Sequence, residues 1–178
     1  MRWADLSSDD YGVSLLNDCK YGCDSKPNQL NLTLLRSASW PDPEADKGHH
    51  EFTYAIYPHA GNWQAAQTVW HGYELNIPLQ VIQLPATSSS KPGTLPTAGS
   101  LLNLSADNLV ITAFKQSEDN PSQWILRCYE CHGLVAKKVS LQSILGLELA
   151  QQVDILERPT QTSVDIMPWK IANFVVEA

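Results

Sequence analysis

Apolar and polar residues alternate in short runs along most of this chain, a pattern typical of half-buried β-strands. The clearest run covers residues 29–35, where Leu30, Leu32 and Leu34 share one face of a predicted strand. Residues 11–16, Y-G-V-S-L-L, favour a second strand. The spacing of the two runs predicts that they pair as a hairpin with an elaborate loop.

A further strand is predicted within residues 48–61, which read G-H-H-E-F-T-Y-A-I-Y-P-H-A-G. β-Branched and aromatic residues favour a strand over 51–57, and Pro58 should end it because proline cannot donate a ladder hydrogen bond. His50 and His59 then lie at opposite ends, about 30 Å apart if the intervening chain extends at about 3.3 Å per residue. At that distance the two histidines cannot share one metal ion.

One helix is predicted directly after this strand. Asn62 is a good N-cap and Gly72 a good helix end. Apolar residues between them recur at helical spacing and form one stripe: Trp63, Ala66, Val69 and Trp70. Residues 77–84 then return to a strand pattern with a proline near its start.

The character of the chain changes after residue 84, where prolines, glycines and serines accumulate. We interpret residues 85–100 as a linker between a first domain, 1–84, and a second domain, 101–178. Residues 145–152 fit a helix and a strand equally well. The second domain contains further strand patterns separated by turn residues, at 109–115, 124–130 and 169–176. Such a succession of short strands favours a mainly all-β protein with one short helix.

Composition narrows the functional classes. Hydrophobic residues make up 43% of the 178, enough for a core, and charged residues only 17%. The net charge is −7, and the sequence has no basic cluster beyond Lys137 and Lys138, which argues against binding nucleic acid or an anionic membrane surface. No apolar run approaches the roughly 20 residues of a spanning helix, and the N-terminus has no signal-peptide pattern. These features predict a cytoplasmic protein with reduced thiols.

The four cysteines form two close pairs, Cys19 with Cys23 and Cys128 with Cys131. Two such pairs can supply the four thiolates of a structural zinc site. However, Cys128 lies inside a predicted strand, so Cys128 and Cys131 would face opposite sides of the sheet. We therefore expect four reduced, mostly buried thiols and no metal.

Two histidine–carboxylate neighbours, His50 with Glu51 and His132 with Glu130, are candidate acid/base pairs, although most such neighbours are structural. The sequence contains none of the common hydrolase, zinc-protease or nucleotide-binding motifs.

An acidic, proline-containing loop at 36–48 is a second candidate site. Its acids, with Asp18 from the preceding region, could flank a glycosidic bond or bind Ca²⁺, whereas a solvated acidic loop is the simpler interpretation. Trp40, close to Arg36 and Asp42, fits a sugar subsite because aromatic faces stack on sugar rings, and packing against the hairpin is its alternative role.

Several long motifs together resemble one known family. They are W-A-D-L-S (3–7), Y-G-V-S-L-L-N-D-C-K-Y-G (11–22), L-L-R-S (34–37), P-D-P-E-A-D (41–46), G-x-H-E-F-T-Y-A-I-Y-P-H-A-G (48–61), E-L-N-x-P-L (74–79), R-C-Y-E-x-H-G (127–133) and D-I-L-E (154–157). In this order they are similar to the C-terminal part of the α-mannosidases of glycoside hydrolase family 38, in the cytosolic, vacuolar and bacterial branch. The resemblance covers nearly the whole chain.

The resemblance implies a fold for this chain and implies that catalysis belongs to a different domain. Residues 1–84 resemble the end of a mutarotase-like β-supersandwich, and residues 101–178 resemble the small terminal β-sandwich. In this family an N-terminal α/β barrel carries the catalytic zinc, the Asp nucleophile and the acid/base. Nothing in this sequence resembles the barrel motifs, so the resemblance implies no catalytic residue and no cofactor in this chain.

The expected function is therefore that of a non-catalytic C-terminal β-domain of an α-mannosidase, which supports the catalytic barrel and shapes the sugar cleft. In Golgi-type relatives an Arg from this β-region reaches the rim of the active site, and Arg36 is its nearest counterpart here. The cleft candidates are Arg36, Trp40, Asp42, His50 and Glu51. The alternative function is a carbohydrate-binding module that uses Trp40 and the acidic loop.

The expected partners follow from the same resemblance. They are the chain's own N-terminal catalytic domain or a separate catalytic chain, α-mannosides, and further copies of this chain. Self-association is expected because strands cut off from a larger sheet leave unpaired edges.

Overall fold

The computed structural model describes residues 1–83, 96–160 and 163–177. It contains two compact units, Met1–Ala86 and Thr87–Ala178, which we describe separately. Among the described residues there is one α-helix, and all other regular elements are strands. The predicted class, mainly all-β with one short helix, is confirmed. Most of the predicted linker, residues 85–95, lies outside the described residues.

A three-stranded antiparallel sheet organises the N-terminal unit. Its strands are β1 (Trp3–Ser7), β2 (Tyr11–Asn17) and β5 (Tyr54–Ala60), in the order β1-β2-β5. The predicted hairpin between residues 11–16 and 29–35 is wrong, because β2 pairs with β1 on one side and β5 on the other.

Residues 29–35 instead contribute a shorter strand, β4 (Gln29–Leu32), which pairs with β3 (Cys23–Lys26). A two-residue turn joins β3 to β4, and Asn28 occupies its left-handed position at φ 60°. Asn tolerates this conformation better than most residues, so the local turn sequence favours the β3–β4 hairpin over the longer-range pairing.

Pro58 does not end β5, which continues to Ala60 and pairs Pro58 with Val13 of β2. This prediction fails because β5 is an edge strand of the described sheet, where a proline nitrogen that needs no partner is tolerated. The extended register places Tyr57 and His59 on one face and Tyr54 and Ile56 on the other.

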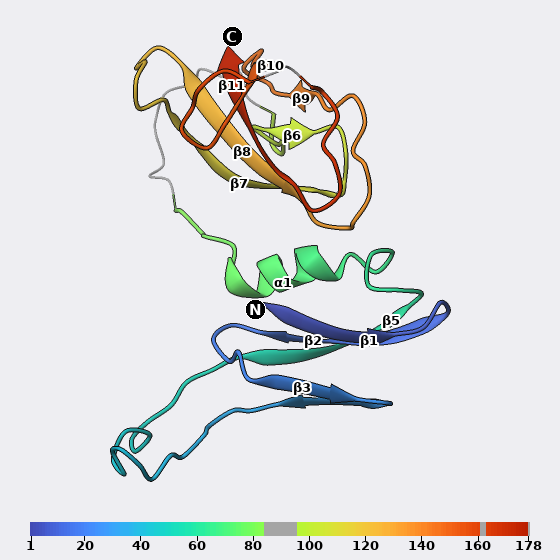
Figure 1. Ribbon diagram of the computed structural model, residues 1–178, viewed down its shortest axis with the longest axis vertical. Coiled ribbons are helices and arrows are strands. Elements are labelled where there is room, and N and C mark those ends of the chain that lie inside the picture. The colour runs from blue at the N-terminus through green and yellow to red at the C-terminus, as the bar shows by residue number, and fades with distance from the viewer. Residues whose placement is uncertain (84–95, 161–162, 178) are drawn as a thin grey trace. The chain divides into compact units, whose positions relative to one another are not determined.

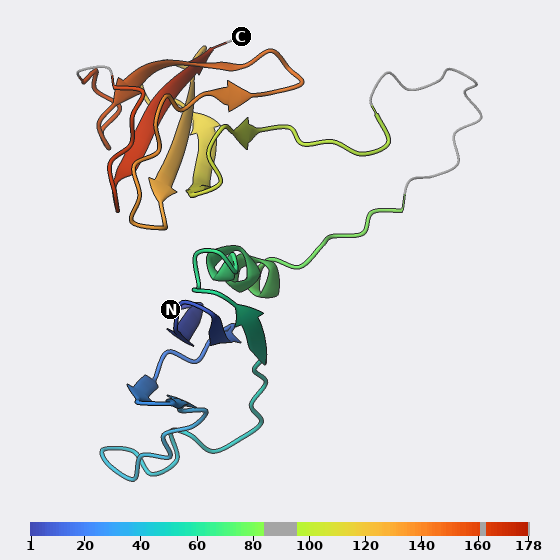
Figure 2. The ribbon, with the colours of Figure 1, turned by 90° about the vertical axis from the view of Figure 1, so that its right-hand side faces the viewer.

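Helix α1 (Thr68–Asn76) lies on one face of this sheet, and the β3–β4 hairpin lies on the opposite side (Figures 1 and 2). The predicted helix end at Gly72 is wrong, since Gly72 is buried inside α1. A Cβ at that position would lie 3.1 Å from the Trp3 ring, so the glycine allows close packing of α1 on β1. Asn62 caps an earlier turn by accepting the Ala65 N–H at 2.9 Å.

The strand predicted at 77–84 is wrong over the part that the structure describes, residues 77–83, where the chain has no strand pairing. Residue 84 lies outside the described residues. The apolar side chains of this segment are exposed, with Leu79 at 98% and Val81 at 94%.

The C-terminal unit is built on a four-stranded antiparallel sheet with the order β10-β11-β8-β7. The strands are β7 (Leu109–Gln116), β8 (Trp124–Glu130), β10 (Glu148–Val153) and β11 (Ile171–Glu177). A second, two-stranded sheet pairs β6 (Asn103–Leu104) with β9 (Leu141–Gln142). Most of the ambiguous residues 145–152 therefore form a strand, because residues from Glu148 onward pair with β11 and Leu149 packs against the apolar core.

The two units differ in the size of their apolar cores. Sixteen of the buried hydrophobic residues among the described residues belong to the C-terminal unit, with Leu126, Phe174 and Val176 at the centre. The N-terminal unit contributes only three, Leu16, Ala66 and Val69. Apolar burial is the main driving force for folding, so the N-terminal unit must depend more heavily on its polar contacts.

Gly12→Ala tests how tightly the N-terminal unit is packed. A Cβ at Gly12 would lie 2.4 Å from His59 Cε1 and from Ser7 Cβ, so a methyl group forces both to move. We expect the free energy of unfolding to fall by about 1–3 kcal/mol. The measurement is urea denaturation followed by tryptophan fluorescence.

The control for this substitution is Gly99→Ala, where the nearest atom, Pro96 Cγ, lies at an ordinary 3.5 Å. Its effect should stay within about 0.5 kcal/mol. Equal stability of the two variants would contradict the packing argument.

Candidate functional site

A cluster of polar side chains is buried between the β1-β2-β5 sheet and helix α1. It consists of Asp5 from β1, Ser14 from β2, His59 from β5 and Thr68, the first residue of α1. Ser14 and Thr68 are fully buried, and the Asp5 and His59 side chains are 4% and 2% exposed. We call these four residues the polar cluster.

Hydrogen bonds connect all four members of the polar cluster. His59 Nε2 lies 2.8 Å from Asp5 Oδ2 and 3.2 Å from Ser14 Oγ. The Ser14 hydroxyl donates to Asp5 Oδ2 at 2.6 Å and lies 2.8 Å from Thr68 Oγ1. At the other end of the ring, His59 Nδ1 donates to the Gly61 carbonyl at 3.2 Å. The imidazole is therefore held on both sides.

This arrangement contains the residue types of a serine-hydrolase triad but not its geometry. In that mechanism the serine and the aspartate contact opposite nitrogens of the imidazole. Here Ser14 and Asp5 share Nε2, and the serine proton is directed at the carboxylate. No atom of the serine is accessible to a substrate. The polar cluster joins three strands to the helix and is structural.

The predicted cleft residues lie on the exposed loop between β4 and β5. Arg36 and Asp42 are exposed, and the Trp40 side chain is 84% exposed and does not pack against the hairpin. Acids of this loop organise its own turns, since Asp42 accepts the Glu44 N–H and Asp46 accepts the Ser37 N–H. The geometry matches the simpler prediction of a solvated acidic loop.

Two of the predicted residues, His50 and Glu51, line a hollow at the end of this loop together with Asp18, Phe52 and Thr53. The hollow has a volume of about 520 Å³. Asp18 is tied to it because Asp18 Oδ2 accepts the Thr53 N–H at 2.8 Å. The structure therefore brings His50 and Glu51 to Asp18, whereas Arg36, Trp40 and Asp42 are not among the residues that line this hollow.

The histidine–carboxylate neighbours do not form the predicted acid/base pairs. The His50 ring donates to the Asp46 carbonyl at 2.9 Å, and Glu51 lies 3.7 Å from His49 in an exposed contact of little energetic weight. Glu130 contacts the backbone N–H of His132, at 2.7 Å.

Glu130 is 1% exposed and organises the loop that follows β8. Its carboxylate accepts the backbone N–H groups of His132, Gly133 and Trp169 and the side-chain amide of Asn108, all within 2.9 Å. Burial alone raises the pKa of this carboxyl, but the hydrogen bonds that it accepts, from the Trp169 backbone first, together outweigh burial and leave the pKa below its ordinary value. A carboxylate held in this way is a structural anchor.

Glu157 has a similar role at the opposite end of the unit. Its carboxylate accepts from Lys115 Nζ at 2.6 Å, from the Ser117 hydroxyl and from the Glu118 N–H. These donors, Lys115 first, lower the pKa of Glu157 to about 2. The contact fastens the turn before Arg158 to the hairpin between β7 and β8.

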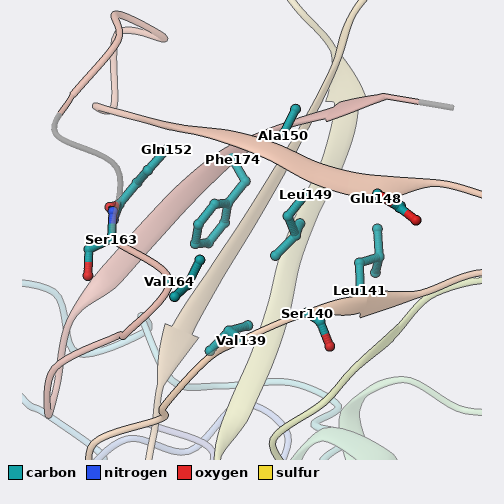
Figure 3. Close-up of a pocket in the computed structure, with 10 residues that line it drawn as sticks. All are labelled: Val139, Ser140, Leu141, Glu148, Leu149, Ala150, Gln152, Ser163, Val164 and Phe174. Atoms are coloured by element: carbon teal, nitrogen blue, oxygen red, sulfur yellow. The ribbon is translucent and has the colours of Figure 1, made fainter.

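A groove in the C-terminal unit lies between β10 and the segments 139–141 and 163–164, with Phe174 of β11 in its wall (Figure 3). Its volume is about 270 Å³. Two of its polar groups are already engaged, since Gln152 Oε1 accepts the Ser163 N–H and the Ser163 hydroxyl donates to the Asp165 carbonyl. The lining mixes apolar side chains with the polar side chains of Ser140, Glu148, Gln152 and Ser163.

The cysteines are all reduced, but only two of them are buried. Burial raises the pKa of Cys128 to about 12 and that of Cys131 to about 11, which makes both thiols unreactive. Cys19 is exposed and Cys23 is half-buried, so the expectation of mostly buried thiols is wrong for this pair. Across the described ranges, no group of three or more His, Cys, Asp or Glu side chains is arranged to hold a metal ion.

Comparison with known proteins identifies the family. The model of the glycosyl hydrolases family 38 C-terminal domain matches residues 1–44, and that of the family 38 C-terminal beta sandwich domain matches residues 108–174. The chain belongs to the C-terminal region of glycoside hydrolase family 38. The resemblance inferred from the sequence motifs is thus confirmed.

Curated relatives of this family 38 chain are α-mannosidases. Alpha-mannosidase 2C1 of Homo sapiens is 41% identical over 89% of the chain, and Alpha-mannosidase G of Dictyostelium discoideum is 33% identical over 97%. The chain spans only 15% and 16% of their lengths. A crystal structure of an alpha-mannosidase from Enterococcus faecalis V583 matches 99% of the chain and 21% of its own length, with a TM-score of 0.77. At 18% identity, that match shows the fold alone.

No helix in the described part of the chain is long and apolar enough to cross a membrane.

The residues that sequence reasoning missed are Asp5 and Ser14, which belong to family-like segments but attracted no role. His59, predicted only to lie beyond the end of a strand, belongs to β5 and is buried. The alternation of side chains along β2 is the signal that could have found them, since Gly12, Ser14 and Leu16 share the inward face of that strand. The β2–β5 register then places Gly12 opposite His59.

Acid titration tests the Glu157 anchor. The folded state lowers the pKa of Glu157 from an ordinary 4.5 to about 2, so its contribution is complete above about pH 5 and disappears as the pH falls toward 2. We expect Glu157→Gln to melt at a lower temperature than the wild type at pH 7, and the difference to shrink between pH 4.5 and pH 2. Thermal melts by circular dichroism across this range provide the measurement.

Glu148→Gln, at an exposed position in the same unit, is the matched control and should show no such pH-dependent difference. A Glu157→Gln penalty that stays constant from pH 7 to pH 2 would contradict the assigned pKa.

Proposed function

We propose that this chain is the non-catalytic C-terminal β-region of an α-mannosidase, in which it supports the catalytic part and helps to shape the sugar cleft. The proposed activity of the whole protein is retaining hydrolysis of α-mannosides. The catalytic zinc belongs, in this proposal, to the catalytic part, and this chain contributes no cofactor. The protein is proposed to act in the cytoplasm.

The proposal rests on one observation. The buried residues that could act as acid, base or nucleophile are already hydrogen-bonded to other groups of this chain. Asp5, Ser14 and His59 bind one another, Glu130 accepts four N–H groups, and Glu157 binds Lys115. Apart from Lys115, all of these residues belong to the family-like motifs. A catalytic carboxyl or nucleophile needs access to its substrate. The hydrogen bonds of these groups instead hold strands, loops and the helix in place.

The loop between β4 and β5 provides the surface through which the chain would reach the sugar cleft. Arg36, Trp40 and Asp42 are exposed on it, and His50 and Glu51 line the hollow at its end. These five residues are proposed to lie at the rim of the cleft, where they contact substrate or the catalytic part without taking part in bond cleavage. Partners are proposed to be the catalytic region, in the same or a separate chain, and α-mannosides.

Complementation tests the proposal. The probe is human Alpha-mannosidase 2C1 from which the region matching this chain has been removed. We expect the purified chain alone to release no nitrophenol from a nitrophenyl α-mannoside. Adding the chain to the shortened relative should raise hydrolysis at least about tenfold, because the chain then supports the catalytic part and restores the sugar cleft. Hydrolysis by the chain alone that is lost in Asp18→Asn, Asp42→Asn or Glu51→Gln would overturn the non-catalytic assignment.

A carbohydrate-binding module is the second candidate, favoured by the exposure of Trp40 beside an acidic loop. Mannose titration followed by tryptophan fluorescence separates the two functions. We expect no saturable change for the wild-type chain. A saturable change that Trp40→Ala abolishes and Trp124→Phe retains would establish the module instead, since Trp124 stacks on Phe114 in the other unit.

A further inference from the structure

The groove beside β10 in the C-terminal unit takes no part in the function proposed above (Figure 3). It lies between β10 and the segments 139–141 and 163–164, and its volume is about 270 Å³. Pockets for drug-sized ligands measure about 300–1000 Å³, so this groove has room for about one small ring. We call it the edge groove, because β10 is an edge strand of its sheet.

The floor of the edge groove is apolar. Phe174 and Leu149 point into the groove from the four-stranded sheet, and Val164 faces them from the opposite wall (Figure 3). Phe174 is buried, Leu149 is half-buried and Val164 is 50% exposed. A ligand in the groove would therefore meet accessible carbon surface in its middle.

Three polar side chains around this floor have hydrogen-bonding capacity left. Among the described residues, neither the Ser140 hydroxyl nor the Glu148 carboxylate has a hydrogen-bond or ion-pair partner, and only the backbone of Ser140 is engaged. Gln152 accepts the Ser163 N–H through Oε1 at 3.2 Å, while its Nε2 donates to no described group. Glu148 and Ser140 lie toward one end of the groove and Gln152 toward the other (Figure 3). The edge groove thus offers an acceptor, a hydroxyl and a donor.

A β-bulge interrupts β10 where the strand borders the edge groove. The register of β10 with β11 shifts between Leu149 and Gln151, so Ala150 has no partner residue in β11. The extra residue of a bulge is left outside the hydrogen-bond ladder of its sheet. Ala150 is exposed and lines the groove, so its backbone provides a further hydrogen-bonding position for a ligand.

We propose that the edge groove binds one pyranose ring of a neutral sugar. The C–H groups on the faces of a pyranose suit the apolar floor, and its hydroxyl groups donate and accept hydrogen bonds around the edge. No lysine or arginine lines the groove, so it does not match a phosphate or a carboxylate. Its single carboxylate, Glu148, is exposed and belongs to no metal-binding group among the described residues. The inference goes beyond the proposed function, because it assigns sugar binding to residues that the cleft proposal does not use.

NMR titration of the purified chain with methyl α-mannoside and methyl α-glucoside tests this site. No tryptophan is among the residues that line the groove, so the tryptophan titration described above does not report it. We expect the methyl signals of Leu149 and Val164 and the amide signal of Ala150 to shift saturably. The expected Kd is about 1–10 mM, as for a small ring held by few hydrogen bonds. Methyl signals of Val110 and Ile125, which do not line the groove, should stay unchanged.

Ser140→Ala and Glu148→Ala each remove one polar partner of the sugar. Both side chains are exposed and make no hydrogen bond within the described part of the chain, so the melting temperature should be unchanged. We expect Kd to rise about fivefold for each variant, because a sugar hydroxyl loses its partner. Gln151→Ala, at an exposed position of β10 that does not line the groove, is the matched control and should leave Kd unchanged.

Cyclohexanol separates a sugar site from an apolar site, since it has a six-membered ring but a single hydroxyl group. It should bind more weakly than either sugar, and equal or tighter binding would overturn the assignment. The inference is also overturned by an absence of shifts up to about 100 mM sugar, or by shifts confined to other residues. Unchanged sugar affinity in both Ser140→Ala and Glu148→Ala would contradict it as well. Complementation of the shortened relative does not depend on the edge groove, so its failure removes the supporting function alone.

Discussion

The N-terminal unit depends on one buried contact, that between His59 and Asp5. Asp5 comes from β1, His59 from β5 and Ser14 from the strand between them, so a single set of hydrogen bonds crosses the whole sheet. Thr68 extends the set to the first residue of α1. Removing one partner leaves a buried polar group unsatisfied, which costs about 1–3 kcal/mol. In a unit with so little apolar burial, this cluster defines how the helix and the strands fit together.

The close approach of neighbouring residues reflects the same constraint. Gly12 lies against the imidazole with no room for a Cβ, and Gly72 lets α1 approach the Trp3 ring. Polar anchors recur in the C-terminal unit, where Glu130 and Glu157 each fasten loops to strands, but there they accompany a substantial apolar core. Both units therefore use buried polar anchors together with apolar packing, but in different proportions. The C-terminal unit buries its own sheet face, whereas the N-terminal unit leaves one largely uncovered.

This imbalance connects the fold to the proposed role. A region that must join a larger protein can leave part of its apolar surface open until the partner layer is in place. Ile56 and Leu79 are exposed in the N-terminal unit and fit that description.

The sequence alone determined the class, the family and most strands, because alternation and turn residues are local signals. Residues 11–16, 109–115 and 124–130 became strands near their predicted bounds, and the motif order identified family 38. Pairing was decided only in the tertiary structure. The short turn at Asn28 favoured β3 as the partner of β4, and an edge position let β5 run through Pro58. Burial of Asp5, Ser14 and His59 depends on three strands and a helix that are distant in sequence, so no local pattern could assign their roles.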